Sequence, residues 1–188
     1  MTTETMLSIF LGIGLAASVG FRIFVPLFVL SLAAHFNIWE LNASWEWVGS
    51  MTAVVTLGVA TCVEVFAYYI PLVDNLLDSI AVPLAAIAGT AVMVSTVADL
   101  SPVITWALAI IAGGGTAAAI AGTSSLTRLA STSTTGGFAN PIVSTLETGT
   151  SLVMSIISLF IPILAIILVI ILLFIIFRIY RKFKSRKT

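Results

Sequence analysis

The chain has 188 residues, of which 60% are hydrophobic and only 9% are charged. About a quarter of the residues in a soluble domain are charged, so this composition excludes a soluble enzyme and indicates an integral membrane protein. The formal net charge is zero, but six of the eight basic residues lie between Arg178 and Lys187. The charge is therefore strongly polarised along the chain.

Five apolar stretches are long enough to cross a bilayer. A helix needs about 20 mostly apolar residues to span about 30 Å of hydrocarbon, and residues 5–34, 48–70, 80–97, 102–122 and 152–179 meet this requirement. The first stretch fits a tilted span, a helix broken at Gly20 and Pro26, or a re-entrant hairpin. We expect an all-α polytopic bundle of about five spans, with one transmembrane domain over 1–177 and a basic tail over 178–188.

The flanking residues predict an orientation. Three tryptophans lie between the first two stretches, at positions 39, 45 and 47, as is typical of the headgroup region. Because cytoplasmic flanks carry an excess of Lys and Arg, the tail from Arg178 predicts a cytoplasmic C-terminus. Counting back through five spans places the tryptophan loop inside, and the N-terminus, the turn around Asp74 and residues 123–150 outside.

Two small-residue segments resemble each other. Residues 12–22 end in Arg22, and residues 114–122 are followed by Arg128. They belong to the first and fourth stretches, so they would have opposite orientations, as in transporters built from inverted repeats. The pattern predicts an inverted repeat that relates stretches one and two to stretches four and five, although membrane helices favour Gly and Ala for packing in general.

Arg22 lies near the middle of the first stretch, where a charge costs at least about 2.5–3.5 kcal/mol. Glu64 is the candidate partner, since helical rise places it at a similar depth in the second stretch. One interpretation is a buried structural ion pair that fixes helix register. The other is that Arg22 or Glu64 faces a polar cavity and handles an ion, a proton or an anionic group.

Two polar regions extend this pattern. Asp74 and Asp78 are spaced to share one helix face, which fits a solvated interfacial turn better than a metal site, because too few ligands are present. Residues 122–141 hold many hydroxyl groups and a single charge, Arg128. They form an ordinary loop, or they dip into the membrane and build an anion site. The residues for such a site are Ser124, Thr127, Arg128 and Asn140.

No catalytic or metal-binding pattern emerges. Cys62 is the only cysteine and His35 the only histidine, which excludes an intrachain disulfide framework and leaves no metal-ligand set. The glycines at 113–115 follow a membrane helix without the strand and lysine of a phosphate-binding loop. We expect no enzymatic activity, no cofactor and no nucleic-acid partner.

Several short motifs resemble a family of bacterial integral membrane proteins classed as domain of unknown function 4126. The motifs are Gly14-Leu15-Ala16-Ala17, Gly20-Phe21-Arg22, Glu64 with Ile70-Pro71, Val73-Asp74 and Asp78, and Thr127-Arg128 with Asn140-Pro141. The family tends to carry an acidic and a basic residue before the Ile-Pro pair, where this chain has Tyr68 and Tyr69. The resemblance implies an inner-membrane location and no established activity.

These observations leave two functional hypotheses. The first is a small transporter or channel for a small ion or metabolite, dimeric, with Arg22, Glu64, Arg128 and Asn140 along its path and the acidic turn of Asp74 and Asp78 beside it. The second is a membrane scaffold or assembly partner whose arginines form buried structural pairs. A water-accessible Arg22 favours transport, and a dry, fully paired Arg22 favours the scaffold.

Overall fold

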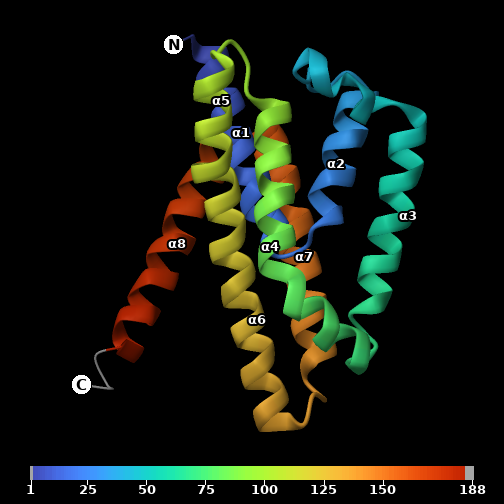
Figure 1. The fold of residues 1–188 in the computed structure, drawn as a ribbon, viewed down its shortest axis with the longest axis vertical. Coiled ribbons are helices and arrows are strands. Elements are labelled where there is room, and N and C mark those ends of the chain that lie inside the picture. Colours follow the sequence, from blue (N-terminus) through green and yellow to red (C-terminus); the bar gives the residue numbers. More distant parts are fainter. Residues whose placement is uncertain (1, 185–188) are drawn as a thin grey trace.

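The computed structural model describes residues 2–184, apart from the side chains at positions 71, 72, 183 and 184. Within this range the chain forms a helical bundle (Figure 1). The elements are α1 (Thr3–Val19), α2 (Phe24–His35), η1 (Ala43–Gly49), α3 (Met51–Ala67), α4 (Pro71–Thr96), α5 (Pro102–Leu108), η2 (Ala109–Gly114), α6 (Gly115–Thr135), α7 (Asn140–Phe160) and α8 (Pro162–Lys184). The predicted all-α architecture is confirmed.

Four helical stretches are long and apolar enough to cross a membrane: Val73–Thr96, Pro102–Thr135, Asn140–Phe160 and Pro162–Lys182. The second joins α5 to α6 through the single-turn π-helix η2. A fifth span arises if η1 and α3 count together, although their axes differ by 65°. The expected number of about five is confirmed, but the spans are not all the predicted ones.

The first apolar stretch forms a helical hairpin. α1 and α2 have 17 and 12 residues, and the chain turns back at Gly20–Ile23 between them (Figure 1). Ser8 Oγ near the start of α1 accepts from Ala98 N, and Asn42 N, beyond α2, donates to Ser95 O. Because Ser95 and Ala98 are both at the end of α4, the hairpin enters and leaves the bundle at the same end.

The C-terminal half differs from the prediction. Most of residues 122–141 is not a loop, since α6 continues to Thr135 and α7 begins at Asn140. The predicted fifth span, 152–179, is divided between α7 and α8 at Ile161, where Pro162 starts a new helix. α7 is an additional span. Its Ser, Thr and Glu residues lower its hydropathy, but Glu147 and all of its serines are buried. Several of the hydroxyls bond to carbonyls one turn earlier.

This rearrangement reverses part of the predicted topology. The N-terminus and the α2–α3 connection lie at one end of the bundle, and the α3–α4 turn, the α6–α7 turn and the C-terminal end of α8 lie at the other (Figure 1). The tryptophan loop is therefore opposite the C-terminus, and the turn around Asp74 is on the C-terminal side. The expected sides of these two regions and of the α6–α7 turn, relative to the C-terminus, were wrong. The N-terminus lies opposite the C-terminus, as expected.

Small residues allow the hairpin and the central helices to pack closely. A Cβ atom added at Gly20 would lie 2.5 Å from Cβ of Ile120 and 2.8 Å from the carbonyl oxygen of Ala117. One added at Gly89 on α4 would lie 2.6 Å from Cβ of Ala117. The hairpin tip is therefore fixed against α6, and α6 against α4, by contacts that only glycine permits.

The described part of the basic segment, residues 178–184, belongs to α8. Arg178, Arg181 and Lys182 are exposed on its last turns. Arg186 and Lys187 lie outside the described residues, so the predicted boundary between a domain over 1–177 and a tail stays a prediction. The inverted repeat also stays a prediction.

Candidate functional site: a charged cluster at the hairpin tip

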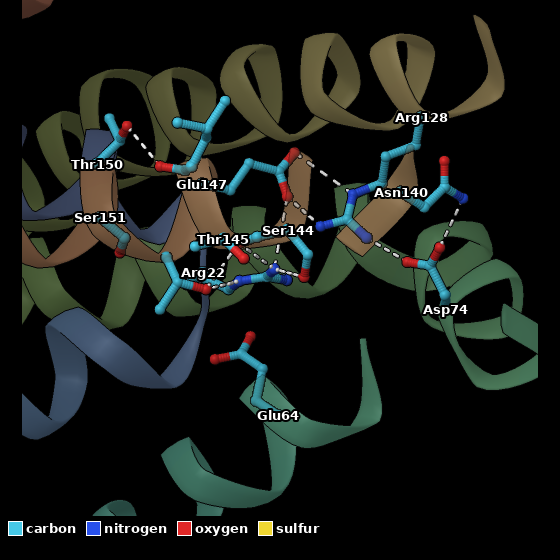
Figure 2. Close-up of polar contacts among 12 residues, drawn as sticks. Arg22, Glu64, Asp74, Arg128, Asn140, Ser144, Thr145, Glu147, Thr150 and Ser151 are labelled. Atoms are coloured by element: carbon cyan, nitrogen blue, oxygen red, sulfur yellow. Dashed lines mark hydrogen bonds and ion pairs between the residues drawn. The ribbon is translucent and has the colours of Figure 1, made fainter. Parts of the chain in front are cut away.

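Arg22 occupies the tip of the hairpin, and its side chain is fully buried. Its Nε donates to Thr148 Oγ1 at 2.9 Å, and its Nη2 donates to the carbonyl oxygen of Ser144 at 3.0 Å and to the Ser144 hydroxyl. Nη2 also lies 3.6 Å from Oε2 of Glu147. The polar face of α7 thus supplies the groups that compensate the buried guanidinium (Figure 2).

Glu64 is near Arg22 but does not pair with it, so the predicted ion pair is wrong. Its Oε1 accepts from the backbone N of Ile23 at 2.8 Å, and its Oε2 from that of Phe24 at 3.0 Å. These N–H groups begin α2 and have no partner inside the helix. The carboxylate of α3 therefore caps a helix that starts within the bundle, where the positive end of the helix dipole favours an anion.

Arg128, on α6, lies among three carboxylates. It contacts Asp74 and Glu147 directly, and its Nε lies 3.8 Å from Oδ1 of Asp78. Asn140 donates from Nδ2 to Asp74 Oδ2 at 2.9 Å. The structure thus joins the predicted acidic turn to the predicted path residues Arg128 and Asn140. Asp74 and Asn140 lie in the first turns of α4 and α7. This part of the cluster is therefore near the end of the bundle at which α8 also ends.

Tyr68 and Glu147 link the two arginines. The Cζ atoms of Arg22 and Arg128 lie 3.8 Å and 4.2 Å from the centroid of the Tyr68 ring. Guanidinium groups at such distances are attracted to the electron-rich ring face. Glu147 is within ion-pair distance of both arginines, so the arginines share one aromatic ring and one carboxylate.

Sequence reasoning missed both linking residues. Glu147 falls in the connection 123–150, which the count of spans places outside the membrane, so no helix is predicted there. Its signal was the recurrence of Ser144, Glu147, Ser151 and Ser155 on one helical face. Tyr68 was considered only as a replacement for a charge before the Ile-Pro pair, and nothing in the sequence placed its ring between two arginines.

Two cavities adjoin the cluster. One, of about 280 Å³ between α6, α7 and α8, has a mostly apolar wall that includes Phe21, Ile120 and Leu172, and Glu147, Thr123, Ser124, Thr127 and Thr150 are its polar lining residues. The other, of about 440 Å³ between α2, α3 and α4, is lined by Glu64, Tyr68 and apolar side chains. Ser124 and Thr127 therefore lie beside Glu147, whereas Arg128 faces carboxylates and not a free anion site.

The chemistry available is that of charge and proton exchange. Four carboxylates, those of Glu64, Asp74, Asp78 and Glu147, surround two guanidinium groups. Across the part of the chain that the structure describes, no group of three His, Cys, Asp or Glu side chains is arranged to hold a metal ion.

Comparison with known proteins identifies the family of the chain. No curated protein matches it, and no solved structure matches it. A family model described as "Domain of unknown function (DUF4126)" matches residues 9–182. Because this match covers nearly the whole chain, the protein belongs to that family, as the short motifs around Arg22, Glu64 and Arg128 suggested.

Proposed function

We propose that the protein transports a small ion or metabolite across the bacterial inner membrane, with Arg22, Glu64, Arg128 and Asn140 along the path. The observation that carries this proposal is the charged cluster at the tip of a hairpin that enters the bundle without crossing it. In transporters, helices that end within the membrane commonly form substrate and ion sites.

The charge balance of the cluster supports ion handling. It contains two more carboxylates than guanidinium groups, and unpaired charge in a buried site is costly. The positive N-terminal end of α2 offsets part of the charge on Glu64. Protons or a bound cation would offset the remaining negative charge of the cluster. A neutral arginine–carboxylate pair would be enough to fix helix register, so the excess favours a cluster that exchanges ions.

A row of hydroxyls extends the polar path beyond the cluster. Ser144, Thr148, Ser151, Ser155 and Ser158 follow one face of α7, and Ser151 Oγ donates to the carbonyl oxygen of Ser18 on α1. At a rise of about 1.5 Å per residue, the row covers about 20 Å. A polar line of this length between α1 and α7 would lead from the cluster toward the opposite end of the bundle.

The alternative function is a scaffold or assembly partner, and the state of Arg22 favours it. The side chain is buried, its Nε and Nη2 donate to Thr148 and Ser144, and Nη2 lies within ion-pair distance of Glu147, whereas Nη1 makes no hydrogen bond. In the transport proposal this arrangement is a closed state. The proposal also includes a homodimer, since a chain of this size encloses a path more readily with a second copy, and a cytoplasmic C-terminus.

Thiol accessibility distinguishes the two functions. In a Cys62→Ala background, single cysteines replace Thr127, in the cavity of Glu147, or Ala60, in the cavity of Glu64. Ile111, an apolar residue 76% exposed on η2, provides the control. For a transporter, a membrane-impermeant maleimide should label both cavity positions in membranes, and the control should stay unlabelled. Protection of both cavity positions from either side would reject the path and favour the scaffold.

A further inference from the structure

The start of α2 holds a carboxylate through both of its oxygens. Ile23 N and Phe24 N donate to Oε1 and Oε2 of Glu64 at 2.8 and 3.0 Å. The 12-residue helix adds the positive end of its dipole. The hairpin tip is thus complementary to a carboxylate group, and the occupant in this structure comes from a neighbouring helix.

Beside this position, one nitrogen of Arg22 has no partner. Arg22 is 1% exposed, and its Nη1 makes no hydrogen bond, although Nε and Nη2 are bound to α7. Figure 2 shows the Glu64 carboxylate turned toward the Arg22 guanidinium without a contact between them. A buried, unsatisfied donor is costly, and more so when it is charged. An acceptor placed closer than Glu64 would remove this cost.

The space beside the carboxylate is almost wholly apolar, with Glu64 as its one charged lining residue. Ile23, Phe24, Glu64 and Tyr68 line one part of the 440 Å³ cavity. The remaining wall is apolar, with Ala60 and Val63 from α3 and Ala81 and Leu84 from α4 among its residues. A ligand that fills this cavity would carry one anionic group and a short hydrocarbon portion.

We propose that the hairpin tip binds the carboxylate of a small amphiphilic acid, in competition with Glu64. The ligand carboxylate accepts from Ile23 N and Phe24 N and reaches Nη1 of Arg22, and its hydrocarbon portion lies between α3 and α4. This inference rests on the proposed transport function and names its substrate class. If the Glu64 carboxylate takes up a proton as the anion enters, the net charge of the cluster is unchanged, so the exchange leaves no new uncompensated charge.

Removing the internal carboxylate tests the site directly. Purified wild-type and Glu64→Ala proteins are titrated in detergent with sodium octanoate, and binding is measured by calorimetry and by the shift in melting temperature. Octylammonium chloride, of equal chain length and opposite charge, is the control ligand. We expect Glu64→Ala to bind octanoate at least about tenfold more tightly than the wild type, because the two N–H groups are vacant. Octylammonium should not bind. Equal responses to the two ligands would overturn the proposal.

Two further variants keep the test valid if Glu64→Ala does not fold. Glu64→Gln retains the shape of the side chain but cannot accept from both N–H groups, so it should show the same preference for octanoate. Ala60→Phe added to either variant fills the cavity and should abolish binding, and octanoate binding that persists would contradict the proposed position. Octanoate binding without flux in proteoliposomes would reject transport and leave the site intact, whereas flux of another solute without octanoate binding would reject only the site.

Discussion

Arg128 is surrounded by the carboxylates of Asp74, Asp78 and Glu147 and is 2% exposed. Its replacement by Met would leave buried acidic groups without a counter-charge, which costs about 3–5 kcal/mol in proteins. We therefore expect Arg128→Met to lower the melting temperature strongly, as measured by thermal unfolding in detergent. Arg178→Met, at an exposed position on α8, is the control and should have little effect.

A double variant separates lost pairing from lost packing. Glu147→Gln removes one of the carboxylates that Arg128 neutralises, so Arg128→Met with Glu147→Gln should be more stable than Arg128→Met alone. If the second substitution instead adds its full cost, the two residues are not energetically coupled, and the cluster would have to be described as independent buried groups.

Tyr68 contributes through its ring. Each guanidinium contact is worth about 0.5–2 kcal/mol, depending on desolvation, and the ring makes two such contacts. Tyr68→Leu should therefore lower the melting temperature clearly, whereas Tyr68→Phe retains both contacts and should be close to the wild type. Equal losses in the two variants would show that the hydroxyl group, and not the ring, is the important feature.

At the level of elements, the hairpin depends on a close approach at Gly20. Its added Cβ atom would lie within 2.8 Å of both Ile120 Cβ and the Ala117 carbonyl oxygen, closer than real contacts. Gly20→Ala should push the tip away from α6 and weaken the bonds of Arg22 to α7, with a lower melting temperature as the measure. Gly149→Ala on α7 meets nothing within 4 Å and should be neutral or slightly stabilising. A stable Gly20→Ala protein would show that the tip is not confined.

The sequence predicted elements well where hydropathy alone determines them. The apolar runs 80–97 and 102–122 correspond to α4 and to the α5–η2–α6 helix, although α4 begins earlier, at Pro71, and α6 continues to Thr135. The run 152–179 did not separate α8 from α7. α7 could not be recognised in this way, because its polar residues face α1 and the cluster rather than water. Among the four candidate spans in the described residues, α7 is the least apolar, although it is still apolar enough to cross a membrane.

The residues selected from the sequence lie close together, but they do not pair as expected, and their role in a site stays a prediction. Arg22, Glu64, Arg128, Asn140, Asp74 and Asp78 all lie in or beside one cluster. The depth estimate correctly placed Glu64 near Arg22. The groups that accept hydrogen bonds from Arg22, however, belong to α7, a helix that the sequence did not predict. The Glu64 carboxylate instead accepts hydrogen bonds from the backbone N–H groups of Ile23 and Phe24. Neither residue depth nor composition predicts such bonds.

For the whole molecule, the division of the last apolar region determines the topology. If α7 and α8 are two spans separated at Ile161, the α6–α7 turn lies on the same side as the C-terminus. A single span over 152–179 would place them on opposite sides. Phe138, in the turn, is 90% exposed, so its replacement by Cys in a Cys62→Ala background gives a suitable reporter.

We expect an impermeant maleimide to label Phe138→Cys only from the membrane face at which a C-terminal tag is accessible to protease. Ser44→Cys, exposed in η1 at the other end of the bundle, is the matched control and should react only from the opposite face. Labelling is compared in intact cells and in inverted vesicles. If Phe138→Cys and the tag were on opposite faces, α7 and α8 would not both cross. The division of the last apolar region into two spans at Ile161 would then be wrong, and with it the position of the α6–α7 turn on the C-terminal side.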